Sequence, residues 1–187
     1  MIEHREWCPA GYQQGGIDGQ RIVIAGHSHT SDDPDHAGMT EECLKNVISG
    51  KYDKIQFFNR VPGYFGFVDK AQFWNSVLFF NFVPSLVGSR AEWANNGTKE
   101  QNDAGRTRVQ RILDQHKPQK LFVFTKKGWG QFPPTLERQK VRPLMEPLNW
   151  HTYATASGHE VRAIGLPHPD RAHKATQIER ITALMAS

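Results

Sequence analysis

The stretch of sequence that decides the fold is Arg21–Ile22–Val23–Ile24–Ala25–Gly26–His27–Ser28–His29. Its apolar, β-branched first part is typical of a parallel strand that is buried on both faces. The apolar run ends at Gly26 and is followed by polar side chains that titrate or hydrogen-bond. Because ligands of open α/β sheets bind beyond the carboxyl ends of the strands, the stretch predicts a central strand and a functional site next to it.

Strand and helix patterns alternate along the rest of the chain. Further strands are expected at 76–83, 120–125 and 161–165, and amphipathic helices at 40–50, 103–116 and 175–185. Loops are expected at 84–102, 126–130 and mainly 142–158, with a short helix at 135–141. Thr40 is the expected N-cap of the first helix. Strands alternating with helices imply right-handed crossovers, so the predicted fold class is α/β: a three-layer α/β/α sandwich with a four-stranded parallel sheet.

The length of 187 residues allows one domain with a sizeable core, which we place at 21–187 behind an N-terminal arm at 1–20. The net charge of +4 permits a polyanionic partner, although many enzymes without such a partner are equally basic. The N-terminal segment lacks the pattern of a signal peptide, and no apolar run is long enough to span a membrane. We therefore expect a soluble, cytoplasmic protein with no membrane contact. The sequence does not indicate its oligomeric state.

The histidines after Gly26 have two interpretations. His27 and His29 lie on alternate residues and could bind one side of a metal ion, with Asp32 or Asp33 as an oxygen ligand. His168 and His173 could supply further ligands from later in the chain. Their spacing differs from the His-x-His-x-Asp-His pattern of metallo-β-lactamase-type hydrolases. Alternatively, both imidazoles hydrogen-bond to loop carbonyls. The two cysteines of the chain form no metal-ligand spacing and no disulfide framework.

A polar residue, Asn81, interrupts the apolar run of the second predicted strand. An asparagine in a central strand is expensive to bury unless its amide is fully paired. The partner could be neighbouring backbone. It could also be a ligand, because a carboxamide offers a donor and an acceptor side by side, which suits the edge of a uracil-like base.

Two prolines flank His168 in the segment Pro167–His168–Pro169–Asp170. They stiffen the backbone and fix the direction of the imidazole. Such rigid presentation suits a group that donates a hydrogen bond to developing negative charge. The simpler interpretation of this segment is a sharp loop before the last helix, without a functional role.

These segments, each at a strand end and in this order, resemble the uracil-DNA glycosylase superfamily. In that family a first strand ends in a Gly-containing loop, a second closes on Asn, and a late His-Pro-Ser segment precedes the final helix. The corresponding segments are Gly26–His27–Ser28–His29, Val77–Leu78–Phe79–Phe80–Asn81 and His168–Pro169–Asp170. Lys120–Thr125 followed by Gly128–Trp129 is similar to the third strand of the family and its exit. The resemblance spans most of the predicted domain.

The resemblance implies hydrolysis of an N-glycosidic bond to a nucleobase, or binding of such a ligand by a relative that does not cleave it. The partner would be nucleic acid, such as single-stranded or damaged DNA, or a free nucleobase or nucleoside. Asn81 would recognise the base, and His168 would stabilise the departing base. An aromatic side chain would stack on the base, the candidates being Phe57, Phe58 and Tyr64. No cofactor is implied, because two cysteines are too few for the iron–sulfur cluster of some family members.

The resemblance also implies roles on the sugar and phosphate side. His27, Ser28 and His29 would lie near the glycosidic bond and the attacking water. The expected nucleic-acid contacts are the backbone of the Gly26 loop and the side chains of Lys126, Lys127, Arg171 and Lys174.

Two residues depart from the family pattern. Ser28 stands where the family has a water-activating Asp or Asn, and His29 or Asp32 is the candidate substitute. Asp170 replaces a serine that contacts phosphate. Two alternatives to the glycosylase hypothesis therefore stay open. The first is a non-catalytic nucleic-acid-binding protein that uses Lys126, Lys127, Arg171 and Lys174. The second is a metal-dependent hydrolase that uses His27, His29, Asp32 and His168.

Overall fold

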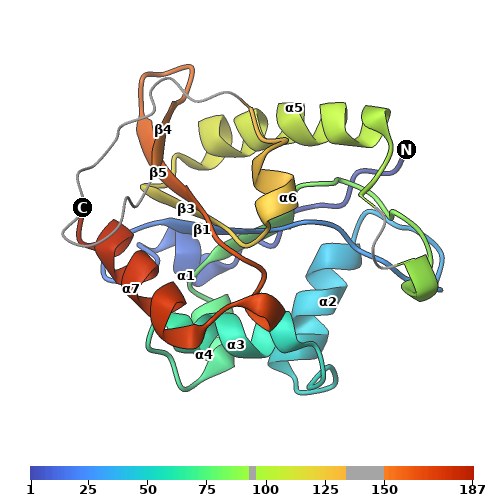
Figure 1. Ribbon diagram of the computed structural model, residues 1–187, viewed down its shortest axis with the longest axis horizontal. Coiled ribbons are helices and arrows are strands. Elements are labelled where there is room, and N and C mark those ends of the chain that lie inside the picture. Colours follow the sequence, from blue (N-terminus) through green and yellow to red (C-terminus); the bar gives the residue numbers. More distant parts are fainter. Residues whose placement is uncertain (93–95, 134–149) are drawn as a thin grey trace.

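The computed structural model describes residues 1–92, 96–133 and 150–187 of the chain (Figure 1). Its described strands form one mixed five-stranded sheet in the order β2-β1-β3-β5-β4. The strands are β1 (Ile22–Gly26), β2 (Leu78–Asn81), β3 (Lys120–Val123), β4 (His151–Ala154) and β5 (Glu160–Gly165). β1 pairs in parallel with β2 and β3, and β3 pairs in parallel with β5. β4 lies at the edge and runs antiparallel to β5.

The mixed sheet corrects the prediction of a four-stranded parallel sheet. Each of the four predicted segments contains a strand, but β4 falls in the segment 142–158 that was expected to be mainly loop. β4 buries only Thr152 and Tyr153, so no apolar run marks it in the sequence. Its backbone is satisfied by pairing with β5, a contact that local sequence does not encode.

Helices cover both faces of the sheet (Figure 1). On one face lie α2 (Met39–Ile48), α3 (Gln56–Tyr64), α4 (Lys70–Trp74) and α7 (Lys174–Met185). On the other face lie α5 (Lys99–His116) and α6 (Lys126–Trp129). The short elements α1 (Ala10–Gln13), η1 (Arg90–Glu92) and η2 (Pro169–Arg171) complete the described chain. The α/β class is therefore confirmed, with helices on either side of the sheet.

Several helix boundaries differ from the predictions for local reasons. The N-cap of α2 is Gly38, while Thr40 lies inside the helix and is buried. α5 begins at Lys99, because Thr98 and Gln101 form a capping box inside the segment predicted as loop. α6 occupies the predicted exit loop of β3 and is capped by the Thr125 side chain. The predicted helix at 135–141 lies outside the described residues.

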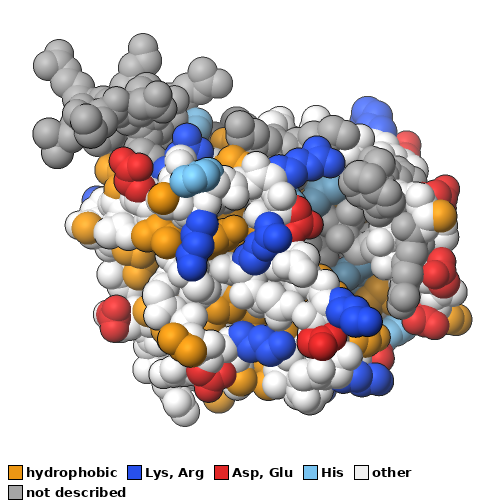
Figure 2. Space-filling view, turned by 60° about the horizontal axis from the view of Figure 1, so that its bottom comes forward, with side chains coloured by type: hydrophobic (Ala, Val, Ile, Leu, Met, Phe, Trp, Pro, Cys, Tyr) orange, Lys and Arg blue, Asp and Glu red, His pale blue; other side chains and the backbone are white. Residues whose placement is uncertain are grey.

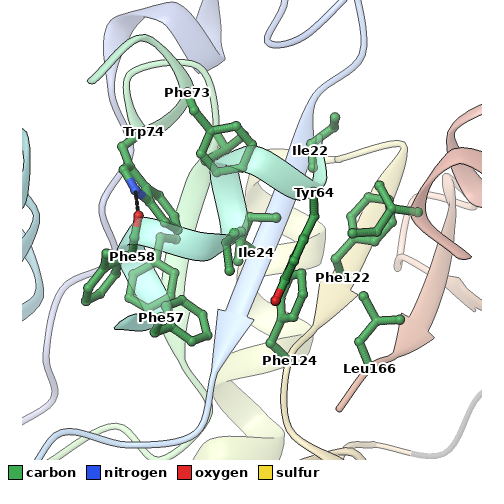
Figure 3. Packing of buried hydrophobic residues seen from close by; sticks show 14 of the residues in the cluster. Ile22, Ile24, Phe57, Phe58, Tyr64, Phe73, Trp74, Phe122, Phe124 and Leu166 are labelled. Carbon is green, nitrogen blue, oxygen red and sulfur yellow. Dashed lines mark hydrogen bonds between the residues drawn. The ribbon is translucent and has the colours of Figure 1, made fainter. Parts of the chain in front are cut away.

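The core divides into two clusters because side chains alternate across each strand. On the α3 side, Ile22 and Ile24 pack with Phe122 and Phe124 and with a group of aromatic rings from α3 and α4 (Figure 3). On the α5 side, Val23 and Ala25 pack with residues of β3 and α5. Burial of each large apolar side chain stabilises the fold by roughly 1.5–3 kcal/mol.

The N-terminal arm lies along the outer edge of β2. The backbone of Trp7 forms an antiparallel bridge with Phe79, and the indole Nε1 of Trp7 donates to the carbonyl of Trp74 at 2.6 Å. His4 is almost completely buried. The arm therefore supplies the hydrogen bonds that an edge strand otherwise leaves open.

Among the helices of the described ranges, none combines the length and apolar character that crossing a membrane requires.

Candidate functional site

The centre of the candidate site is the close approach of two strand ends. Gly26 of β1 is in register with Asn81 of β2. A Cβ atom on Gly26 would lie 2.3 Å from Oδ1 of Asn81 and 3.3 Å from the tip of the Phe79 ring. Only glycine therefore allows the Asn81 carboxamide to lie across the end of β1.

The Asn81 carboxamide has no protein partner but keeps a small contact with solvent. Asn81 is 5% exposed, and none of the side-chain hydrogen bonds within the described residues involves its carboxamide. Its amide nitrogen and oxygen are not fully enclosed, in contrast to Oε1 of Gln177, which is buried without a partner. Of the two partners that the sequence left open, neighbouring backbone is not used. The donor and the acceptor of the carboxamide are therefore open to a ligand.

A chain of aromatic contacts connects the Asn81 end of the sheet to His168. The ring of Phe57 lies 5.7 Å from Phe79 and 5.9 Å from Phe124, between centroids. The same ring lies 5.7 Å from the imidazole of His168. Figure 3 shows Phe57 and Phe124 toward the carboxyl end of β1. Gly26, Phe57 and His168 thus share one face of the sheet, the face covered by α3 and α7.

The two other aromatic candidates have partners of their own. Phe58 packs edge-to-face on Trp74, whose indole donates to the Phe58 carbonyl at 3.0 Å (Figure 3). Tyr64 stacks on Phe124, and its hydroxyl donates to the carbonyl of Pro169, next to His168, at 3.4 Å. All three rings are buried in the same core cluster, and Phe57 differs in that its ring contacts the imidazole of His168.

His168 has a fixed orientation and a defined tautomer. Its side chain is 44% exposed, and its Nδ1 accepts a hydrogen bond from the backbone N–H of Asp170 at 3.3 Å. Because Nδ1 accepts, the proton of a neutral imidazole is on Nε2. Burial lowers the pKa of His168, with Asp170 opposing the shift and Arg171 and Arg60 adding to it. The ring is therefore neutral at neutral pH and offers one N–H donor.

Three side chains hold the His168 loop, and two of them, Arg60 and Gln177, were not singled out in the sequence analysis. Arg60 donates to the carbonyl of Pro169 at 3.0 Å, the same oxygen that accepts from Tyr64. From α7, Nε2 of Gln177 donates to the carbonyl of Pro167 at 2.8 Å. Gln177 is 1% exposed. A polar residue in an amphipathic helix carries no sequence signal for such a long-range contact.

His27 lies against α6. A Cβ atom on Gly128 would lie 3.1 Å from Nδ1 of His27 and 2.4 Å from Cγ2 of Thr125. α6 follows β3 on the face opposite to α3 and α7. His27 is thus packed under the exit of β3, and the glycine at 128 makes room for it.

His29 belongs to a separate polar cluster. Its Nε2 lies 3.0 Å from the hydroxyl of Thr40, and its ring centroid lies 5.3 Å from that of His4. His4 in turn places Nε2 at 2.5 Å from Oδ1 of Asp35. Burial, with a smaller contribution from the charges of His4 and Arg108, lowers the pKa of His29 to about 3. His29 is therefore neutral and already engaged by its neighbours.

The remaining predicted residues lie around these two histidines and around His168. Ser28 is half-buried between His27 and His29, and Asp32 is exposed in the following turn. Arg171 and Lys174 are exposed beside the His168 loop. Lys126 and Lys127 open α6, but their side chains lie outside the described part of the structure. Figure 2, which brings the side of α3, α4 and α7 forward, shows Lys and Arg side chains interspersed with acidic ones.

Potential metal ligands do not converge. Within residues 1–92, 96–133 and 150–187, no three His, Cys, Asp or Glu side chains are grouped so that they could hold a metal ion. His27, His29 and His168 lie in the three different environments described above, so the geometry does not favour the metal-dependent reading.

Comparison with known proteins adds no assignment: no protein-family model matches the chain, and no curated protein matches its sequence.

Proposed function

We propose that this protein binds a uracil-like nucleobase at the carboxyl edge of β1 and β2 and hydrolyses its N-glycosidic bond, as a glycosylase-like enzyme. One observation carries the proposal: the carboxamide of Asn81, which has no hydrogen-bond partner within the described residues, lies across Gly26 on the same face as Phe57 and His168. The resemblance to the uracil-DNA glycosylase superfamily, drawn from the strand-end motifs, points to the same residues.

Base recognition is assigned to Asn81 and Phe57. The carboxamide pairs with the edge of a pyrimidine that places a carbonyl next to an N–H, because it offers a donor and an acceptor side by side. Phe57 is the stacking residue, because it is the aromatic candidate that contacts His168. Stacking on an aromatic side chain is worth about 1–3 kcal/mol per base.

His168 is assigned to the leaving group. As the glycosidic bond breaks, negative charge develops on the base, and the Nε2–H of a neutral imidazole donates a hydrogen bond to it. The N–H of Asp170 keeps Nδ1 an acceptor, and Gln177 and Arg60 keep the loop in position. A preformed donor costs little reorganisation at the moment of reaction, which is the advantage of this arrangement.

The sugar side of the site departs from the family pattern. Ser28 replaces the usual acidic residue, and the hydroxyl of a serine does not stabilise an oxocarbenium-like cation as a carboxylate does. His29 is engaged by Thr40, so it is a poor substitute as a water-activating base. This observation favours a second candidate function, in which the same site binds the nucleobase or nucleoside without cleaving it.

Contact with nucleic acid is proposed through basic residues that follow two strand ends. Arg171 and Lys174 adjoin the His168 loop, and Lys126 and Lys127 lie in sequence after β3. Backbone groups of the Gly26 loop are further candidates for contact with phosphate. If phosphate contacts dominate, affinity for single-stranded DNA falls steeply with salt.

The test is base release from a uracil-containing single-stranded oligonucleotide, with protein in excess over substrate. We expect release by the wild type that is lost in Asn81→Ala and kept in the control Asn75→Ala, an exposed asparagine. Loss of Asn81 is expected to reduce affinity for the base by about 10–100-fold, equivalent to one or two unmade hydrogen bonds. Binding of the base without release would support the second candidate. Absence of both release and binding would contradict the proposal.

A further inference from the structure

A second cluster of reactive groups lies far from the nucleobase site, where the N-terminal arm meets the end of α5. The Sγ atom of Cys8 lies 3.8 Å from Nδ1 of His116. The other ring nitrogen, Nε2, lies 3.3 Å from Oε1 of Glu6. One imidazole thus bridges a thiol and a carboxylate, and Gln13 adds an N–H donor at 3.7 Å from the same sulfur.

The charges around this imidazole favour its protonated form. Burial alone would lower the pKa of His116, but the hydrogen bonds to Cys8 and Glu6 outweigh burial and raise it to about 9. Hydrogen bonds from His116 and Arg111 hold the pKa of the Glu6 carboxyl far below its usual range, although burial opposes this. An imidazolium that is held by a carboxylate on one side can donate its other N–H to sulfur.

Such an arrangement activates a thiol. A cationic N–H beside sulfur stabilises the thiolate, which is the nucleophilic form of cysteine. The surrounding ionisable groups come from each neighbouring element: Glu3 and Glu6 from the arm, Tyr12 from α1, Arg21 before β1, and Arg108 and Arg111 from α5. Cys8 and Cys43 are both partly buried, so the two thiols differ in their partners and not in their class of exposure.

The chain contains its own reference thiol. Cys43 lies on α2 against the apolar cluster, and burial raises the pKa of its thiol to about 12. Apart from burial, the charge of Glu42 acts on this thiol and adds to the rise of its pKa. The two cysteines therefore share one polypeptide but differ in their electrostatic surroundings.

We infer that Cys8 is a reactive thiol, activated by His116 and Glu6, that forms mixed disulfides with low-molecular-weight disulfides. The Cys8 thiolate attacks one sulfur of the disulfide and forms a new S–S bond. The other half leaves as a thiolate and takes up a proton, so the low-molecular-weight disulfide is the oxidant and one of its sulfurs is reduced. The inference is independent of the nucleobase site.

The test is the rate at which oxidised glutathione adds to the full-length protein, followed by intact mass and by peptide mapping. In the wild type at pH 7, we expect Cys8 to react about 100-fold faster than Cys43, because reactivity follows thiolate content and only Cys8 has an imidazole and a carboxylate beside it. In a Cys43→Ser background, His116→Gln and Glu6→Gln are each expected to slow the reaction of Cys8 at pH 7 by about tenfold.

The pH dependence of the Cys8 reaction rate distinguishes activation of the thiol by His116 from mere covering of the sulfur by the imidazole. At pH 10 a thiol forms thiolate without help, so the rates of wild type and His116→Gln should converge. A faster reaction of His116→Gln at both pH values would mean that His116 only covers the sulfur, and would overturn the inference. Equal rates for Cys8 and Cys43, or an unchanged rate in both variants at pH 7, would also overturn it.

Discussion

His168 and His29 both follow the carboxyl end of a strand, yet the structure gives them opposite surroundings. His168 is about half exposed, a local backbone N–H occupies its Nδ1, and its Nε2 has no protein partner among the described residues. His29 is partly buried, and its ring is bonded to Thr40 and packed against His4. A neutral histidine with an open donor can act on a ligand, whereas a neutral histidine with a bonded ring holds neighbouring segments together.

The largest effects are expected when the side chains of His168 and His29 are truncated in turn. His168→Ala should reduce base release about 10²–10³-fold, the usual cost of losing one donor to developing negative charge. Its effect on the free energy of unfolding should stay within about 0.5 kcal/mol, because the side chain is half exposed. His173→Ala, at another exposed histidine beside the same loop, is the control for release.

His29→Ala should show the reverse pattern. Losing its packing and the hydrogen bond to Thr40 should destabilise the fold by about 1–3 kcal/mol, while the rate of base release stays within about twofold. Chemical denaturation and single-turnover release on the same samples measure both quantities. If His29→Ala abolishes release while remaining folded, the division between the two histidines is wrong.

Filling the space at Gly26 should damage the site through Asn81. In Gly26→Ala the new methyl group would lie 2.3 Å from Oδ1 of Asn81, so the carboxamide must move. We expect at least about tenfold weaker base binding and a loss of about 1–3 kcal/mol in stability from overpacking. Gly63→Ala is the matched control, because a Cβ atom there meets nothing within 4 Å. Wild-type affinity in Gly26→Ala would show that the position of Asn81 is irrelevant to binding.

The free energy of unfolding should depend on pH because of the titration of His29. Its pKa is about 3 when folded and near 6.5 when unfolded. Between these values the unfolded chain binds a proton that the folded chain does not, so stability falls as pH drops from about 6.5 toward 3. His4, whose pKa is also lowered by burial, acts in the same direction.

Urea unfolding at pH 7 and pH 5 measures this effect. We expect the wild type to lose about 1–2 kcal/mol over this interval, and His29→Ala to lose clearly less. A loss of equal size in both proteins would mean that His29 is not the group that titrates.

The smallest effect on stability and base release is expected from a substitution of Gln177, which holds the His168 loop in place. Gln177→Met removes the hydrogen bond to the carbonyl of Pro167 but preserves most of the buried volume. Stability should fall by about 1 kcal/mol and base release by a few-fold, because the donor is less well positioned. Glu179→Met, at an exposed position of α7, should change neither. If Gln177→Met releases the base at the wild-type rate, Gln177 does not position His168.

The strands were the most predictable part of the fold, because β-branched and aromatic runs such as 22–26 and 120–123 indicate a strand from the local sequence alone. β4 was missed since its pairing with β5 is the main reason for its existence. α3 was not recognised because Pro62 lies inside it and glycines surround it, although its buried aromatic residues hold it on the sheet.

The sequence singled out candidate site residues where a residue type was unusual for its position. Asn81 in an apolar strand and His168 between two prolines were singled out from sequence, and aromatic contacts connect their ends of the sheet. The histidines of the first loop could not be sorted in the same way. Their roles depend on partners distant in the chain, namely Gly128 for His27 and Thr40 and His4 for His29.

The most direct test of the nucleobase site is a spectrum of the histidine ring nitrogens, recorded by NMR on ¹⁵N-labelled protein with and without free uracil. The account predicts that His168 is a neutral Nε2–H tautomer whose signals shift on addition of uracil, while the signals of His29 stay in place. Signals of His168 that do not respond at saturating uracil, or a response confined to His29, would contradict it.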